Sequence, residues 1–284
     1  MAAVPPGSKV ISEEIGHHTL KPLTSYLSSK LLTVEADKEG MCPQALGRAC
    51  SEGGVRALFV MPGPISPTVS VMGPARRIEI VEIARRYGLF IIENDPLGML
   101  VEGGLTPFAT LAPERTFYVS TFTKTVLPGL RTGYLVVPTD MIAATTNRAI
   151  VTNWMAPPLL AEIAARWVED GTAKELVLWQ RDALLRRHEI VDESLQGLIF
   201  GTHPQSLHIW LRLPQGYVEQ EFVANARHRG VSVAPGRAFA LADKAHPPAV
   251  RISVGSSRPE ELRRGLTIIG EILKGELEPI LHTL

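Results

Sequence analysis

Cysteine, net charge and long apolar runs are scarce in this sequence, and each scarcity excludes a class of protein. Only Cys42 and Cys50 are present, and their spacing fits neither a disulfide framework nor a zinc site. The 29 basic residues balance the 29 acidic ones, so net charge gives no reason to expect binding to nucleic acid or to a membrane. No apolar run reaches the length of a transmembrane helix, and the first residues do not form a signal peptide. We therefore predict a cytoplasmic protein.

Enough apolar sequence is present for a substantial core. The chain has 284 residues, of which 45% are hydrophobic and 20% charged. This length suits one large domain, or a large domain with a smaller one. A strand-like segment at 9–12 begins almost at once, which suggests that the first domain is incomplete at its start.

The first half alternates strand-like and helical patterns. The segment 74–88 has apolar residues at helical spacing, basic residues opposite them, and a glycine at its end. Short apolar runs bounded by glycine and proline lie on either side of it. Alternation at this spacing predicts an α/β fold with a mostly parallel central sheet and flanking helices. The predicted strands are 55–62, 89–95, 115–121 and 133–138.

The second half has a different character. Two long helical patterns fill 154–198. Short strands predicted at 206–214, 230–236 and 249–255 then alternate with two more helices, at 218–230 and 259–275. We expect a large domain over 1–150, connecting helices over 151–197 and a smaller C-terminal α+β domain over 198–284. In open α/β sheets, ligands bind beyond the carboxyl ends of the strands. Three predicted strands end in polar or turn-rich segments: 62–68, 93–96 and 120–124.

The stretch STFTKTVLPGLRTGY (120–134) concentrates the chemistry. Thr121 and Thr123 offer hydroxyls just before Lys124, at the end of a predicted strand. A Pro-Gly pair then turns the chain toward Arg131, a planar cation suited to a phosphate. A lysine amine beside a phosphate site suits a Schiff base with an aldehyde that carries a phosphate. A solvated lysine in a hydroxyl-rich loop is the alternative at this point, and no P-loop pattern is present.

This stretch resembles the S-x-S-K-x-x-x-P-G-L-R-x-G-Y signature of fold-type-I pyridoxal-phosphate-dependent aminotransferases of class I/II. It is most similar to the aminoadipate/kynurenine aminotransferase group and to the aminotransferase-like domain of MocR-type regulators of the GntR family. Further segments resemble motifs of the same family, so the likeness covers nearly the whole chain. These segments are ALFVMPGPISPT, LFIIENDPLGML, HRGVSVAPGRAF and VRISVG. The resemblance implies pyridoxal 5'-phosphate as cofactor and a homodimer with the site at its interface.

The resemblance also implies roles for individual residues. Lys124 corresponds to the lysine that forms the Schiff base, and Thr121, Thr123 and Arg131 correspond to the ligands of the cofactor phosphate. Arg251 corresponds to the arginine that binds a substrate α-carboxylate. A surface arginine at a strand edge is the alternative for this position, although its flanking apolar residues place it on the opposite face of the pleat.

His17 falls where the family has the aromatic residue that stacks on the pyridine ring. A histidine in an ordinary turn is an equally good interpretation of the pair His17 and His18. The two lack the spacing of a helical metal site, and we predict no metal.

Three positions depart from the family pattern. The residue expected to pair with the pyridine nitrogen is Asn94 instead of aspartate, and an amide supplies no negative charge to keep that nitrogen protonated. The neighbouring Asp95 should point to the opposite face of its strand. Leu97 and Ser66 occupy positions where the family has a tyrosine and an asparagine that contact the cofactor's ring oxygen.

Two functions from different classes follow, and the sequence leaves both open. An aminotransferase would move an amino group between an amino acid and a 2-oxo acid through Lys124. A domain derived from a MocR-type regulator would bind the cofactor or an effector without completing a catalytic cycle. The family's glycine-rich helix and the regulators' winged helix find no counterpart here, so we expect no DNA binding by this chain itself. A degenerate fragment with a structural role is a third interpretation.

Overall fold

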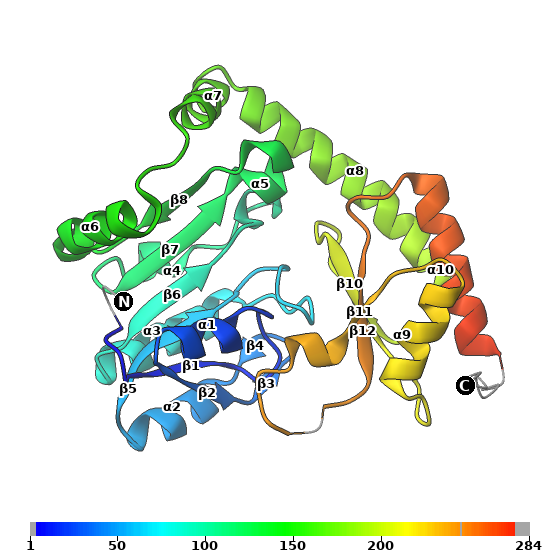
Figure 1. Cartoon of the computed structure of the whole chain (residues 1–284), viewed down its shortest axis with the longest axis horizontal. Coiled ribbons are helices and arrows are strands. Elements are labelled where there is room, and N and C mark those ends of the chain that lie inside the picture. Colours follow the sequence, from blue (N-terminus) through cyan, green and yellow to red (C-terminus); the bar gives the residue numbers. More distant parts are fainter. Residues whose placement is uncertain (1–3, 245, 276–284) are drawn as a thin grey trace.

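Two β-sheets organise the chain, and long helices connect them (Figure 1). The computed structural model describes residues 4–244 and 246–275. The larger sheet has six strands in the order β2-β1-β5-β6-β7-β8. Every neighbouring pair in it is parallel except the last, in which β8 runs antiparallel to β7. The predicted mostly parallel sheet is confirmed. Its strands are β1 (Lys9–Glu13), β2 (Lys30–Val34), β5 (Val55–Val60), β6 (Phe90–Asn94), β7 (Thr116–Thr121) and β8 (Gly133–Val136).

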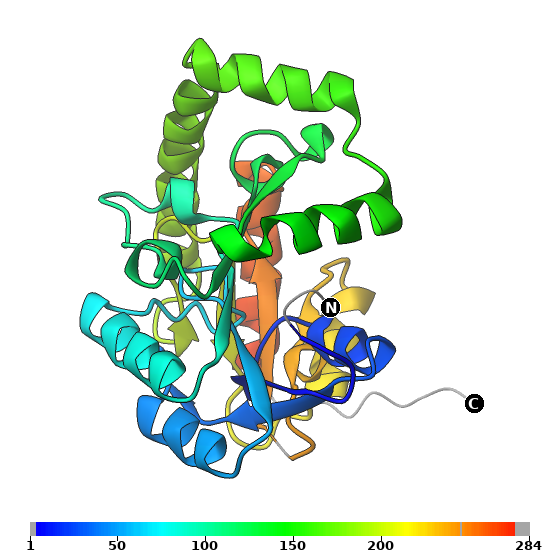
Figure 2. The ribbon, with the colours of Figure 1, turned by 90° about the vertical axis from the view of Figure 1, so that its left-hand side faces the viewer.

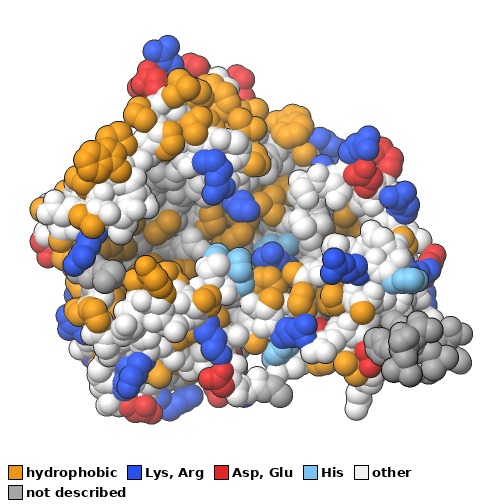
Figure 3. Space-filling view, in the orientation of Figure 1, with side chains coloured by type: hydrophobic (Ala, Val, Ile, Leu, Met, Phe, Trp, Pro, Cys, Tyr) orange, Lys and Arg blue, Asp and Glu red, His pale blue; other side chains and the backbone are white. Residues whose placement is uncertain are grey.

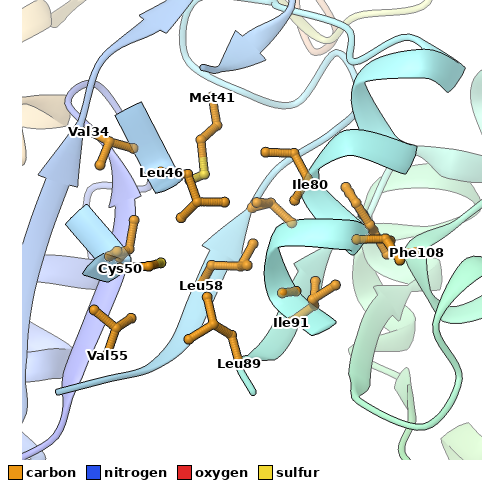
Figure 4. Packing of buried hydrophobic residues seen from close by; sticks show 14 of the residues in the cluster. Val34, Met41, Leu46, Cys50, Val55, Leu58, Ile80, Leu89, Ile91 and Phe108 are labelled. Carbon is orange, nitrogen blue, oxygen red and sulfur yellow. The ribbon is translucent and has the colours of Figure 1, made fainter. Parts of the chain in front are cut away.

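Helices cover one face of the large sheet and enclose its main core. Alternate residues of the central strands point toward this layer, where Leu58 and Ile91 are fully buried. Figure 4 shows Leu46, Ile80 and Phe108 packed around them. Proline at the first position of two of these helices suits a helix start, because the missing N–H has no partner there in any case. The helices are α2 (Pro43–Ser51), α3 (Pro74–Arg86) and α4 (Phe108–Leu111).

Shorter elements fill the connections around the large sheet. A hairpin of two-residue strands lies between β2 and α2, and short helical segments follow several strands. The opposite face of the sheet carries a smaller cluster that includes Val10, Ala57 and Phe117. These elements are β3 (Ala36–Asp37), β4 (Gly40–Met41), α1 (Leu20–Tyr26), η1 (Gly98–Leu100), α5 (Phe122–Thr125), η2 (Pro128–Leu130) and η3 (Thr139–Met141).

The second sheet is small and antiparallel, in the order β11-β12-β10-β9. Two helices and the end of α8 pack on it, and its core includes Ile209, Val250, Phe222 and Leu266. The sequence predicted β10 and β12 closely, but the predicted strand at 230–236 contains only the two residues of β11. The elements are β9 (Phe200–Gly201), β10 (His208–Arg212), α9 (Glu219–His228), β11 (Ala234–Pro235), η4 (Gly236–Phe239), β12 (Ala249–Ser253) and α10 (Pro259–Lys274).

Three helices lead from one sheet to the other. The sequence indicated α7 (Pro158–Glu169) and α8 (Thr172–Ser194), and it missed α6 (Ile142–Asn153). Figure 1 shows α8 running along the upper edge of the molecule toward α10, and Figure 2 shows α6 and α7 standing away from the large sheet. Leu97 and Leu100 pack against Val177 and Leu184 of α8, which anchors this helix to the loop after β6.

A large apolar surface remains open beside β8. All four residues of this edge strand are exposed, and α6 has no buried residue. Contiguous exposed apolar side chains of this extent usually mark an interaction site. We call this surface the β8 face. The side chains that form it include Tyr134, Leu135, Val136, Val151, Trp154, Met155 and Leu159.

Within 4–244 and 246–275, no helix combines the length and the apolar character needed to cross a membrane.

Candidate active site

A cleft of about 340 Å³ lies where the carboxyl ends of the central strands meet the small sheet. In Figure 3 the surface is hollowed near the centre of this face, and basic and histidine side chains stand at the border of the hollow. Its volume falls within the usual range for ligand pockets, about 300–1,000 Å³. The lining residues are His17, His18, Met61, Ile65, Pro67, Asn94, Pro96, Thr121, Thr123, Lys124, Arg131, Phe239 and Arg251.

The turn after β7 holds Lys124 at this cleft. Thr121 ends the strand and caps α5, because its hydroxyl oxygen accepts a hydrogen bond of 3.0 Å from the backbone N–H of Thr123. The same hydroxyl donates to the carbonyl of Thr132, 2.8 Å away, and so ties the start of the turn to its end. The hydroxyls of Thr121 and Thr123 lie 2.9 Å apart. Gly133 is required where the chain returns, since a side chain there would meet the carbonyl of Ser120 at 2.8 Å.

Arg131 faces the same cleft from an unusual backbone conformation. It follows η2 with φ of 47°, in the left-handed region that side chains rarely adopt. Within 4–244 and 246–275, no hydrogen bond or ion pair joins the side-chain nitrogens of Arg131 or of Lys124 to another residue. A strained residue whose charge faces a cavity is a frequent sign of a binding site.

Arg251 brings a third cation to the cleft from the small sheet. It lies on β12 opposite Trp210 of β10. Its guanidinium carbon is 4.4 Å from the centre of the Phe239 ring, a cation–π contact that leaves the N–H donors available. Burial lowers the pKa of Arg251, since desolvation penalises its charged form. The cleft therefore carries three cations and no carboxylate side chain among the described residues that line it.

His17 is held as a neutral ring. Its Nδ1 lies 2.8 Å from the hydroxyl of Thr19, and its ring stacks on His18 with 4.8 Å between the centres. Burial lowers the pKa of His17, and the neighbouring His18, Arg251 and Lys124 lower it further. A neutral ring facing the cleft is suited to stacking on another flat ring.

Asn94 and Asp95 lie on opposite faces of the sheet end, as the pleat predicted. Asn94 lines the cleft, whereas Asp95 lines a separate small cavity with Tyr118 and Arg77. The hydroxyl of Tyr118 donates to Asp95 Oδ2 at 3.2 Å, and burial raises the pKa of Asp95. Asp95 therefore does not supply to the cleft the charge that Asn94 lacks.

Ser66 and Leu97 have side chains that do not line the cleft. Ser66 is fully buried and its hydroxyl lies 2.8 Å from that of Ser70, so the expectation of cofactor contact finds no support in its position. Leu97 is buried against α8. The seven other predicted site residues all line the cleft: His17, Asn94, Thr121, Thr123, Lys124, Arg131 and Arg251.

Sequence reasoning assigned no role to several residues that complete the cleft. Phe239 lies under Arg251, and it is the last residue of a motif that carried the family resemblance, so a signal was present. His18 stacks on His17 and meets the edge of Phe239. Ile65 and Pro67 flank Ser66, and only the tertiary structure brings them to the cleft wall.

The donor set fits pyridoxal phosphate. Three cations without a carboxylate partner in the described lining suit a ligand that carries several anionic groups. Arg131, Thr121 and Thr123 offer N–H and O–H donors for a phosphate, and Lys124 offers an amine for an aldehyde. His17 presents a neutral ring beside them.

We expect Arg131→Gly to weaken cofactor binding without weakening the fold. Glycine adopts positive φ freely, so the free energy of unfolding should change by no more than about 1 kcal/mol. Loss of a charge-assisted contact to the phosphate should raise the dissociation constant for pyridoxal phosphate at least tenfold, roughly. Calorimetric titration and chemical denaturation measure the two effects. Ser28→Gly is the control, because Ser28 also has positive φ and lies outside the cleft lining. Unchanged affinity in Arg131→Gly would contradict the phosphate role.

Comparisons with known proteins agree with this geometry. Residues 1–269 match the family profile described as aminotransferase class I and II. The HTH-type transcriptional regulator YdeF of Bacillus subtilis is 29% identical over 272 residues, which cover 94% of this chain and 58% of that protein. An aminotransferase of Saccharolobus solfataricus is 27% identical over 231 residues, which cover 78% and 57%. The chain thus spans less than two thirds of the length of these relatives.

Solved structures share the fold. The crystal structure of kynurenine aminotransferase from Pyrococcus horikoshii, in complex with PMP, superposes with a TM-score of 0.89 at 22% identity and covers 97% of this chain and 71% of that one. The α-aminoadipate aminotransferase LysN from Thermus thermophilus gives 0.86 at 21% identity, with 96% and 72% covered. Together with the profile match over 1–269, this means that the chain belongs to the aminotransferase class I and II family, for which pyridoxal phosphate is the cofactor.

Proposed function

We propose that this chain transfers an amino group between an amino acid and a 2-oxo acid, with pyridoxal phosphate held at Lys124. The observation that carries the proposal is the convergence of Lys124, Arg131 and Arg251 on one cleft whose described lining contains no carboxylate. Like charges gathered in a partly desolvated cleft repel one another until an anionic ligand compensates them. A cofactor phosphate and a substrate carboxylate together meet this requirement.

The proposal gives six of the residues that line the cleft a role that their position supports. When bound, pyridoxal phosphate supplies an aldehyde that condenses with amines and a ring that withdraws electrons. Arg131, Thr121 and Thr123 bind the phosphate, and His17 stacks on the ring. Arg251 binds the α-carboxylate of the substrate and so orients its α-carbon toward Lys124. The amine of Lys124 then moves the proton at that carbon, and the amino group lost by the amino acid is gained by the 2-oxo acid.

Asn94 weakens the electron withdrawal on which the transfer depends. At the position where the family has a carboxylate, its amide forms hydrogen bonds but carries no charge to hold a proton on the ring nitrogen. Asp95 cannot compensate from the opposite face, where it accepts the hydrogen bond from Tyr118. We therefore expect turnover to be slow even though the phosphate and lysine positions are retained.

Lys124→Ala tests the cofactor assignment directly. Purified protein incubated with pyridoxal phosphate should develop a visible absorbance band from covalent attachment, and the substitution should abolish it because Lys124 is the only lysine among the described residues that line the cleft. Absorbance spectra after removal of free cofactor measure this. Lys174→Ala changes an exposed lysine of α8 and should leave the band intact. A wild-type protein that shows no band with excess cofactor would refute the proposal.

Asn94→Asp should raise the rate of amino transfer by at least about tenfold, since a carboxylate at this position stabilises the protonated ring nitrogen and so the developing carbanion. Formation of 2-oxo acid from a panel of amino acids, with pyruvate as acceptor, measures the rate. Asn225→Asp adds the same charge on α9 and serves as the control. If the rate is equal in the wild type and in Asn94→Asp, the electron-withdrawal argument is wrong.

A second candidate function is a ligand-sensing domain that binds cofactor and amino acid without turnover. The amide of Asn94 favours it, and so does the similarity to HTH-type transcriptional regulators at 29% and 23% identity. With 29 basic and 29 acidic residues, the segment itself offers no excess charge for DNA, and we propose that it does not bind DNA by itself. Saturable binding of an amino acid with no 2-oxo acid formed would favour the sensor over the enzyme.

The domain limits and the cellular location are also proposals. Limits at 150 and 197 place the two sheets in separate domains, with the first limit inside α6 and the second just beyond α8. The outer limits, residues 1 and 284, lie outside the described residues. Two free cysteines, Cys42 and Cys50, are compatible with the cytoplasm.

We further propose a homodimer that pairs through the β8 face. Exposed apolar side chains on this edge strand and on α6 and α7 support the proposal. Light scattering should give the mass of two chains of 31.0 kDa, and Leu159→Glu, which places a charge on this face, should give the mass of one. Val218→Glu changes an exposed apolar residue elsewhere and should not alter the mass. A wild-type monomer at every concentration tested would contradict the dimer.

A further inference from the structure

Two buried hydrogen bonds fasten the loop after β5 to the small sheet. The hydroxyl of Ser206 donates to the carbonyl of Pro64 at 2.9 Å, and Nε2 of His208 lies 3.0 Å from the carbonyl of Ser66. Ser206 and Ser66 are fully buried, and His208 is 3% exposed. Buried hydrogen bonds of this kind are costly to break, because the carbonyl that is left without a donor loses its hydration as well.

His208 can make its bond only with a proton on Nε2, the atom that faces the carbonyl of Ser66. A carbonyl oxygen accepts but never donates, which fixes the tautomer. Burial, helped by the charge of Arg251, lowers the pKa of His208 to about 4, so the ring is neutral near pH 7. The backbone N–H of His208 also donates to the hydroxyl of Ser206 at 3.3 Å, which links the Ser206 side chain to strand β10.

The loop held in this way forms one wall of the cleft. Ile65 and Pro67, the neighbours of Ser66, both line it. Residues 61–73 contain no helix or strand, and the backbone bonds inside the loop are those of turns, such as that from the N–H of Val69 to the carbonyl of Ser66 at 2.9 Å. Thr68 of the loop also packs closely against β9, since a side chain at Gly201 would meet the carbonyl of Thr68 at 2.5 Å.

Strand β10, which carries His208, also lies beside the arginine wall. In the register of β10 with β12, Trp210 lies opposite Arg251 and His208 opposite Ser253. Trp210 packs with Val69 of the loop and with Phe239, the ring that lies under Arg251. Strand β10 thus contacts both walls of the cleft. It pairs with β12, which carries Arg251, and His208 joins it to the loop through a buried hydrogen bond.

We propose that His208 is a positioning residue that sets the separation between Arg251 and the loop wall of Ile65 and Pro67. The substrate class follows from the proposed function, on which the inference rests: a ligand whose carboxylate binds Arg251 while its remaining atoms lie against the loop. His208 touches neither ligand nor cofactor. It acts by holding the carbonyl of Ser66, so its loss should affect substrate binding more than cofactor attachment at Lys124.

Two substitutions separate the donor from the volume of the side chain. His208→Leu removes the N–H donor, and His208→Gln restores a donor near the position of Nε2. Ser206→Ala removes the neighbouring bond to Pro64 with little change in volume, and it keeps the test decisive if His208→Leu does not fold. Tyr217→Phe is the matched control, because it removes a side-chain bond to a carbonyl, that of Ile272 at 3.1 Å, elsewhere in the small domain.

Hydrogen exchange followed by mass spectrometry measures how firmly the loop is held, and it needs neither cofactor nor turnover. Amides of 62–72 should exchange at least tenfold faster, roughly, in His208→Leu and in Ser206→Ala than in the wild type, and His208→Gln should reverse most of the change. Tyr217→Phe should leave 62–72 unaffected. Equal exchange of this segment in all variants would overturn the positioning role, and faster exchange across the whole chain would show only global destabilisation.

Substrate and cofactor binding give the second readout. With cofactor-loaded protein and pyruvate as the probe, the dissociation constant should rise roughly tenfold in His208→Leu, while the Lys124-dependent visible band keeps its intensity. With L-alanine as donor, KM should rise and kcat should change little. A missing band in the wild type would refute the proposed function and leave the exchange result to decide the inference. A normal band with unchanged pyruvate binding in His208→Leu would overturn the inference alone.

Discussion

Three cations repel one another in the cleft, and no carboxylate in its described lining compensates their charge. Lys124 and Arg131 come from the turn after β7, and Arg251 comes from the small sheet. Elsewhere in the described chain the buried Arg77 forms an ion pair with Glu93 at 3.4 Å. Keeping three cations without such partners costs folding free energy unless a ligand compensates them. The hydrogen bond of the Thr121 hydroxyl and the left-handed backbone of Arg131 hold this turn in place.

The residues that line the cleft are better suited to binding the cofactor than to activating its ring. The residues suited to a phosphate and an aldehyde all converge, whereas the position suited to the ring nitrogen carries the amide of Asn94. Two acidic side chains lie close behind it, but Glu93 is paired with Arg77 and Asp95 accepts from Tyr118 on the far face of the sheet. The pleat of β6 therefore isolates the cleft from the charge that would make the ring a strong electron sink.

Much of this could be predicted from the chain alone. Hydrophobic alternation and turn residues located β5, β6 and α3 closely, because these elements share one continuous core where local pattern and burial agree. They also located β7, whose Phe117 belongs to the cluster on the other face of the sheet. The motif around Lys124 indicated the phosphate side of the cleft, since its residues are neighbours in sequence. The prediction was weaker in the small domain, where the strand expected at 230–236 shortened to β11, and α6 was missed because it buries nothing that a pattern could reveal.

By itself the sequence determined the chemistry available at the turn after β7 and the alternation that builds a parallel sheet, because both depend on residues close together along the chain. Tertiary structure decided which side chains face the cleft. It brought Phe239 under Arg251, turned Ser66 and Leu97 away, and attached the loop after β5 to the small sheet through His208. The attachment through His208 joins residues 142 apart in the sequence, and no local spacing encodes the distance between two walls that meet only after folding.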